Sequence, residues 1–266
     1  MIIDSHEHLI FPAKKQLAKL SEAGADKAIL FSTLPHPENA ESLVEIKEEM
    51  KRLYEILNGK NTREGNIKRM DMGIGELKDR IDQFPEKFLG FGPVPLGFNV
   101  QDTKSWIENK IIRNGFLGIG EFTPGSDKQV EQLKVVFEAI QEYDYMPIWV
   151  HTFNPVSLSG LKILMSFCDE YSNVKVIFGH LGGSNWMETI EFAKNHKNVY
   201  LDLSAAFASI ATKIAVNEIP ERCLYSSDAP YGEPLLYRQL IEYVSPSIEI
   251  TERILGGNIC ELLDIN

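Results

Sequence analysis

The sequence has few cysteines, little basic charge and no long apolar run. Its three cysteines, Cys168, Cys223 and Cys260, lie far apart, which excludes a disulfide framework and a Cys-x-x-Cys metal site. The 27 lysines and arginines face 38 aspartates and glutamates, and the net charge of -11 argues against a nucleic-acid or anionic-membrane partner. No run approaches the roughly 20 apolar residues that span a bilayer. The N-terminus lacks the basic segment of a signal peptide, so we expect a cytoplasmic protein that acts on a small molecule.

The sequence does contain a regular alternation of apolar, strand-like runs and amphipathic helices. The eight runs are 1–8, 27–32, 88–94, 116–122, 147–151, 174–180, 199–203 and 223–228. In a chain of 266 residues this alternation predicts an α/β fold, a (β/α)8 TIM barrel formed by one domain over residues 1–266. A doubly wound open sheet is the alternative. It would place a glycine-rich turn after the first strand, where this chain has His6 and His8.

One segment, at about 38–84, is longer and more charged than a barrel crossover requires. Glu48 and Arg52 are four positions apart and indicate a solvated helix. Asn58-Gly59 would end that helix, and a second one is expected around 74–81. Such a helical insertion is either a lid over a site or a decoration of the barrel. We expect decoration, because no residue in it has an obvious chemical role.

Six side chains that are able to bind a metal stand at the carboxyl ends of predicted strands. They are His6 and His8 after the first strand, Glu121 after the fourth, His151 after the fifth, His180 after the sixth and Asp228 after the eighth. A His-x-His pair alone is weak evidence for a metal site, and a single carboxylate at a strand end is more often a helix cap or an ion-pair partner. TIM-barrel enzymes gather their chemistry at this end of the strands, so the coincidence of all six predicts one metal site.

The two-residue period of a strand predicts which way these side chains point. By that period Leu117 and Ile119 share a face with Glu121, Val176 and Phe178 with His180, and Leu224 and Ser226 with Asp228. We expect each of these columns to face the inside of the barrel, with the polar residue at its top. Asp4 has the parity of His6 and is expected to orient a ligand from behind.

Taken together, these motifs resemble the amidohydrolase superfamily, and within it the amidohydrolase-2, or amidohydrolase-related, branch of predicted TIM-barrel metal-dependent hydrolases. The motifs are Asp4-Ser5-His6-Glu7-His8, Gly120-Glu121, Val150-His151-Thr152, the stretch 178–183, Ser227-Asp228-Ala229-Pro230 and Gly257-Asn258. They occur in order along the whole chain, which makes the resemblance far more specific than any one of them.

The resemblance implies a role for each of the six residues. His6, His8 and Asp228 would bind one divalent ion, His151 and His180 a second, and Glu121 would bridge the two. Asp228 would also accept a proton from the attacking water, and His180 is the other candidate for acid/base chemistry. Imidazole and carboxylate ligands suit Zn²⁺ best, with Mn²⁺, Fe²⁺, Co²⁺ or Ni²⁺ as alternatives. One or two ions are compatible with these ligands, and we expect two.

The resemblance therefore implies a hydrolase that uses metal-activated water on an ester, lactone or amide-type bond of a small molecule. A mononuclear decarboxylase or lyase of the same branch is the main alternative. It would hold its metal with His6, His8, His151 and Asp228, use His180 as acid/base and leave Glu121 without a role. A lactonase that works without metal and a non-catalytic metal-binding barrel are further alternatives, and a homodimer is left open.

Candidate substrate-binding residues follow the functional strands in sequence. They are His36, Phe153, Asn154, Trp186 and Tyr231. Each is as compatible with local packing or solvation as with contact to substrate. No arginine follows a functional strand closely enough to be nominated as a carboxylate anchor, so the sequence does not identify the substrate.

Overall fold

Eight parallel strands form the centre of the protein, a computed structural model of which describes residues 1–57, 63–143 and 145–265. The strands are β1 (Ile3–His8), β2 (Lys27–Phe31), β3 (Phe88–Gly92), β4 (Gly118–Phe122), β5 (Ile148–His151), β6 (Val176–Gly179), β7 (Val199–Asp202) and β8 (Cys223–Leu224). Each strand pairs with its neighbours in sequence. Between β1 and the segment that follows β8, Ser5 N donates to Tyr225 O at 2.8 Å and His8 N donates to Ala229 O at 2.7 Å. The predicted single-domain TIM barrel is therefore confirmed.

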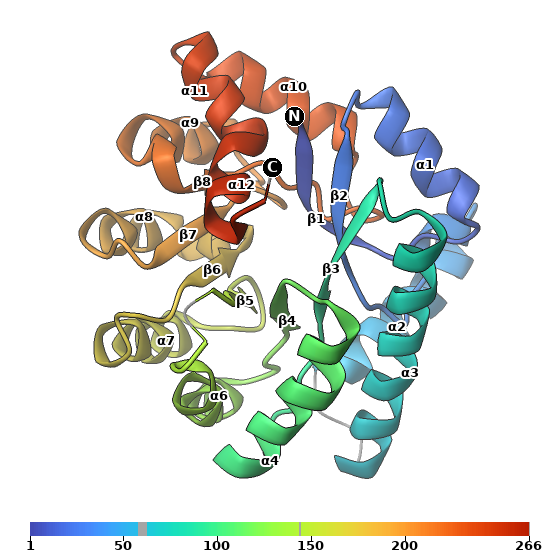
Figure 1. Cartoon of the computed structure of the whole chain (residues 1–266). Coiled ribbons are helices and arrows are strands. Elements are labelled where there is room, and N and C mark those ends of the chain that lie inside the picture. The colour runs from blue at the N-terminus through green and yellow to red at the C-terminus, as the bar shows by residue number, and fades with distance from the viewer. Residues whose placement is uncertain (58–62, 144, 266) are drawn as a thin grey trace.

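Helices surround the strands, as Figure 1 shows. They are α1 (Ala13–Glu22), α2 (Leu43–Leu57), α3 (Arg63–Gln83), α4 (Val100–Trp106), α5 (Asp127–Glu131), α6 (Leu133–Ile140), α7 (Leu158–Glu170), α8 (Trp186–Asn195), α9 (Ser209–Glu218), α10 (Pro234–Val244), α11 (Ile248–Glu252) and α12 (Asn258–Leu263). Short 3-10 or π turns are η1 (Pro37–Asn39), η2 (Ile107–Ile111), η3 (Ile112–Asn114), η4 (His180–Asn185), η5 (Pro220–Arg222) and η6 (Arg253–Gly257). Within the described ranges, no helix has the length and apolarity needed to cross a membrane.

The apolar side chains divide into two cores, one on each side of the strands. The inner core fills the barrel and is closed by α12; it contains Ile3, Phe31, Phe91, Trp149, Ile177, Leu224 and Ile259. The outer core lies between strands and helices and contains Leu30, Ile119, Val176 and Phe178. The predicted inward column is therefore right for Leu224 and wrong for Ile119, Val176 and Phe178, which face the helices. Glu121 and His180 consequently cannot reach the barrel interior by simple strand alternation.

The insertion consists of η1, α2 and α3 and lies between β2 and β3 (Figure 1). The second predicted helix, around 74–81, is part of the longer α3, whereas the predicted break at Asn58-Gly59 lies outside the described residues. Ile74 and Leu77 of α3 are buried against the barrel. Gly73 allows this approach, because a Cβ at that position would lie 2.8 Å from Ser32 Cβ. The helix α3 is thus fixed against the end of β2.

Candidate metal centre

The six predicted side chains meet at the carboxyl ends of the strands. His8 Nε2 lies 3.2 Å from Asp228 Oδ1, and His6 Nε2 lies 3.8 Å from the same oxygen. Glu121 Oε2 lies 3.8 Å from His6 Nε2, and Glu121 Oε1 lies 3.1 Å from His180 Nε2. His180 Nε2 is 2.9 Å from His151 Nδ1. The structure thus brings together residues from β1, β4, β5, the end of β6 and the segment after β8.

Departures from regular strand geometry turn these side chains inward. The register of β4 on β5 shifts between Ile119 and Phe122, so Glu121 lies within the irregular stretch. Another shift, between Asp4 and Glu7 of β1, surrounds His6. His180 and Asp228 follow their strands with positive φ angles of 62° and 58°. Residues other than glycine adopt this left-handed backbone rarely, and it is often found at functional sites.

Glu121 divides the cluster into two halves. Its Oε2 lies 3.8 Å from His6 Nε2 and 3.9 Å from His8 Nε2. Its Oε1 lies 3.2 Å from His151 Nδ1 and 3.1 Å from His180 Nε2. In each half, the three ligand atoms lie within 4.8 Å of one another. Ligands about 2 Å from a tetrahedral ion are about 3.3 Å apart, so each half is close to the size that a divalent ion requires.

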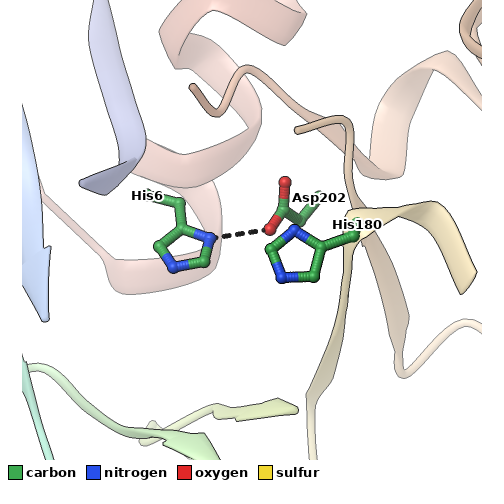
Figure 2. Close-up of side chains that lie close together, drawn as sticks. All are labelled: His6, His180 and Asp202. Atoms are coloured by element: carbon green, nitrogen blue, oxygen red, sulfur yellow. Dashed lines mark hydrogen bonds and ion pairs between the residues drawn. The ribbon is translucent and has the colours of Figure 1, made fainter. Parts of the chain in front are cut away.

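A second layer of hydrogen bonds orients the imidazoles, and Asp202 is its central residue (Figure 2). His6 Nδ1 lies 2.9 Å from Asp202 Oδ2, and Asp202 Oδ1 accepts from Ser204 N at 2.6 Å. Ser204 Oγ lies 2.8 Å from His180 Nδ1. A carboxylate only accepts, so His6 donates from Nδ1 and presents its Nε2 to Glu121 and Asp228. Sequence reasoning missed Asp202, although it ends β7 and the rule applied to the other strands would have found it.

His151 is oriented in the same manner by a backbone group. Its Nε2 lies 2.9 Å from the carbonyl oxygen of Asn154. A carbonyl oxygen only accepts, so Nε2 carries the hydrogen and the Nδ1 lone pair faces Glu121 and His180. Three of the cluster's ring nitrogens, on His6, His151 and His180, are therefore directed at the two oxygens of one carboxylate or at the space beside them.

Asp4 has a different role from the predicted one. Its Oδ1 accepts from His6 N at 3.2 Å and from Ser227 N at 3.0 Å, so it binds backbone and not an imidazole. The register shift in β1 explains why Asp4 and His6 do not behave as residues of one face. Asp228 N also donates to His6 O at 2.8 Å. These bonds hold the segments that carry His6 and Asp228 against each other.

The electrostatics of the cluster favour a cation. Burial alone would lower the pKa of His6, but its hydrogen bond to Asp202 and the charges of Glu121 and Asp228 raise that pKa to about 9. Burial would also lower the pKa of His180, but the carboxylates of Glu121 and Asp228 raise that pKa to about 10. Burial would raise the pKa of Glu121, yet the neighbouring imidazoles of His151 and His180 hold it well below the usual range. Positive charge is thus stabilised on the imidazoles and negative charge on the carboxylate.

The donor set fits a divalent metal ion. His6 Nε2 is buried and has no hydrogen-bond partner among the described residues, although it faces two carboxylates. A buried polar nitrogen without a partner is unfavourable, and a metal ion in this position would satisfy it. The combination of imidazole and carboxylate ligands is also the one that zinc and similar ions prefer.

A cavity of about 440 Å³ opens from the cluster, which is a size typical of small-molecule sites. Glu121, Asp228 and the exposed sides of His8, His151 and His180 line it. Of the predicted substrate residues, Phe153, Asn154 and Tyr231 line it as well. The Tyr231 ring lies edge-on to His8, with centroids 5.9 Å apart.

The other two predicted substrate residues, His36 and Trp186, are not among the described residues that line the cavity. His36 Nδ1 is 3.2 Å from Glu38 Oε1, and its ring lies edge-on to Phe11. Trp186 is the first residue of α8 and packs against the outer core. Both side chains therefore have structural partners elsewhere, and neither lines this cavity as placed.

The insertion forms one wall of the cavity, so the expectation that it merely decorates the barrel is wrong. Its contributions are Met50, Leu53 and Tyr54 from α2 and Arg69 and Met70 from α3. No sequence signal pointed to them, because they lie on helices far from any strand end. An arginine is thus present in the cavity after all, although it does not follow a functional strand.

Comparisons with known proteins agree with this fold. A sequence model of the amidohydrolase family matches residues 76–265. Similar solved structures include dihydroxybenzoic acid decarboxylase from Polaromonas, with bound manganese (17% identity, 99% of this chain and 96% of that chain, TM-score 0.67). Others are 5-carboxyvanillate decarboxylase from Sphingomonas paucimobilis (16%, 100% and 99%, 0.67) and 4-oxalomesaconate hydratase from Rhodopseudomonas palustris (13%, 99% and 96%, 0.72). A comparison with curated protein sequences finds no match.

Proposed function

Because the chain belongs to the amidohydrolase family, we propose that it is a metal-dependent hydrolase acting on an ester, lactone or amide-type bond of a small molecule. The observation that carries this proposal is the position of Glu121 between two pairs of imidazoles. One of its oxygens faces the β1 imidazoles, and the other faces His151 and His180. A carboxylate placed between two sets of ligands suits two neighbouring ions, which is an arrangement common in hydrolytic enzymes.

In this proposal His6, His8 and Asp228 would hold one ion, His151 and His180 would hold the other, and Glu121 would be available to both. Zn²⁺ is the ion that suits these ligands best, and Mn²⁺, which the similar Polaromonas decarboxylase binds, is the first alternative. A bound divalent ion supplies a Lewis acid that polarises the substrate and lowers the pKa of water. A lactonase without metal fits less well, because it would leave His6 Nε2 buried and without a partner.

The protein's own residues would then handle the proton. Asp228 lines the cavity and its Oδ1 lies beside His8 Nε2, so its carboxylate is placed to take a proton from water and pass it to the leaving group. Asp202 holds His6 in one tautomer, and Ser204 fixes the position of the His180 ring. Phe153 and Tyr231 line the cavity beside the cluster, where their rings would limit the access of bulk water.

A mononuclear decarboxylase or lyase is the second candidate. It is favoured by the similar structures, two of which are decarboxylases of aromatic acids and one a hydratase. His6, His8, His151 and Asp228 would hold the single ion, and His180 would exchange a proton with the substrate. Glu121 would then have no direct role, although its contacts to four imidazoles argue for one.

Metal content separates the two candidates. We expect about two divalent ions per chain in protein prepared without chelator, measured by inductively coupled plasma mass spectrometry. Glu121→Gln should lower this number and abolish hydrolysis of a panel of aryl esters and lactones. One ion per chain, retained in Glu121→Gln, together with release of CO₂ from aromatic acids, would instead favour the decarboxylase. A non-catalytic barrel predicts that Asp228→Asn leaves the biological activity intact.

Two other expectations are carried forward as proposals. A cytoplasmic location is supported by Cys168, Cys223 and Cys260, which are all free thiols. A homodimer stays a prediction, which light scattering on the purified protein tests directly.

A further inference from the structure

Arg69 of α3 is an arginine without a partner at the edge of the candidate active site. It lines the same cavity as Glu121 and Asp228, and it is the only lysine or arginine among the described residues of that lining. It makes no hydrogen bond or ion pair with any residue that the structure describes. Its Nε is buried from solvent and unpaired. Two acidic groups are thus present in the cavity, but neither neutralises this guanidinium.

A second arginine of the same helix shows what a structural arginine looks like in this protein. Arg80 is buried, and its Nη1 donates to Gln16 Oε1 at 2.6 Å. Its Nη2 donates to Ile10 O at 3.1 Å, and its guanidinium lies over the Phe11 ring. The fold therefore provides partners for Arg80 and provides none among the described residues for the buried Nε of Arg69. Burial without a compensating partner also lowers the pKa of Arg69, which marks its charge as incompletely solvated.

The chemistry of the guanidinium indicates the kind of ligand that would satisfy it. Its two Nη groups form a planar fork that matches the two oxygens of a carboxylate. A single arginine balances the charge of a carboxylate, whereas a dianionic phosphate would keep a negative charge close to Glu121 and Asp228. The lining of the same cavity also includes apolar and aromatic side chains, among them Met50, Leu53 and Phe153. The cavity thus suits a molecule with an apolar body and a terminal carboxylate.

The position of Arg69 is fixed by the helix that carries it. Gly73 lies one turn further along α3, and the absence of its Cβ lets the helix contact Ser32. Ser32 and Arg69 line the cavity together, and both also line an adjoining cavity of about 330 Å³. The close packing at Gly73 therefore holds α3, and with it the backbone of Arg69, against the end of β2.

We propose that Arg69 binds a carboxylate of the substrate that does not react, so that the substrate is a small organic acid whose apolar body lies between Arg69 and the metal cluster. This inference deepens the proposed function and rests on it for the reacting end of the molecule. The insertion between β2 and β3 then selects the substrate, while the barrel carries out the chemistry.

Binding of matched acids to the zinc-loaded protein tests the proposal by calorimetry. The probes are benzoate and its three dicarboxylate relatives, phthalate, isophthalate and terephthalate, because benzoate has one carboxylate for the metal and the others have a second for Arg69. At least one dicarboxylate should bind about 30-fold more tightly than benzoate, as expected for a partly buried charge pair. In Arg69→Met this preference should fall below about threefold. Arg69→Lys, which keeps the charge and loses the fork, should give an intermediate preference.

Arg52→Met is the matched control, because Arg52 lies on α2 of the same insertion with an exposed side chain and does not line the cavity. It should keep the wild-type preference. The proposal is overturned if no dicarboxylate is preferred, if Arg52→Met removes the preference equally, or if Arg69→Met weakens benzoate and the dicarboxylates alike.

Hydrolysis of 3-carboxyphenyl acetate and of phenyl acetate, together with metal content of the same samples, distinguishes this proposal from the proposed function. Loss of the binding preference in Arg69→Met without ester hydrolysis by the wild type supports the carboxylate site and counts against the hydrolase. Ester hydrolysis with no dicarboxylate preference supports the hydrolase and overturns the carboxylate site.

Discussion

The mouth of the barrel and the wall formed by the insertion contribute to one cavity but are built differently. At the mouth, charged and polar side chains lie against one another: Glu121 contacts four imidazoles, and Asp202 and Ser204 support two of these from behind. In the wall, α2 and α3 supply apolar side chains and one unpaired arginine. The comparison teaches that a site held by strands is suited to fixed chemistry, whereas a site held by an added pair of helices is suited to selection.

The largest effect is expected at the mouth, from loss of Asp228. Asp228→Asn removes both a metal ligand and the proton acceptor, so kcat/KM should fall about 10³-fold or more. Asp79→Asn, on the exposed face of α3, is the matched control and should keep the wild-type rate. A loss of less than about tenfold in kcat/KM for Asp228→Asn, with a substrate that the wild type turns over, would contradict the assignment of the chemistry to the mouth.

Metal removal should destabilise the mouth and leave the wall intact. A free metal concentration of about one hundred times the Kd stabilises the folded state by about 2.7 kcal/mol. Dialysis against chelator should therefore lower the melting temperature by several degrees. Calorimetric scans before and after adding Zn²⁺ measure the change. A melting temperature that does not respond to chelator or to added metal contradicts the metal site.

Asp202 tests whether the second layer matters to the mouth. Asp202→Asn permits the other tautomer of His6, and metal affinity should fall about 10- to 100-fold. Competition with a chelating dye measures this affinity. Ser204→Ala, which leaves the Asp202 carboxylate in place, should lower the metal affinity less. Equal losses in both variants would mean that the layer acts as packing and not by setting the tautomer of His6.

The smallest effects are expected in the wall, where two glycines of one helix can be compared. A Cβ at Gly75 would meet nothing within 4 Å, so Gly75→Ala should stabilise the protein by about 0.5–1 kcal/mol through helix propensity. Gly73→Ala should lose that gain, because its Cβ would lie 2.8 Å from Ser32 Cβ. Urea denaturation measures both. Equal stabilisation by the two variants would show that α3 is not held against β2.

The sequence predicted the barrel and the meeting of six side chains, but not the way in which they meet. Strand alternation placed Ile119 and Phe178 inside the barrel, whereas both lie in the outer core. The position of a residue at a strand end was informative because all parallel strands end at the same rim. Its direction was not predictable, because a register shift at β4 and a positive φ at His180 are local backbone features without a clear sequence signature.

The cavity wall could not be predicted for a different reason. Arg69 and Tyr54 belong to helices of an insertion, and their distance from the mouth depends on how α2 and α3 pack on the barrel. Gly73 is a sequence feature that reflects this packing, but a glycine within a helical pattern has several explanations. Asp202, in contrast, ends β7 and could have been identified.

The hydrogen bonds that join β1 to the segment after β8 have a consequence for biosynthesis. His6 and Asp228 lie near opposite ends of the chain, yet Asp228 N donates to His6 O and Asp4 accepts from Ser227 N. A nascent chain that has left the ribosome only as far as β7 carries five of the six proposed ligands and still lacks both the last one and the contacts that close the ring. Tight loading with metal should therefore come last, after translation has passed Asp228, and would report that the whole barrel has folded.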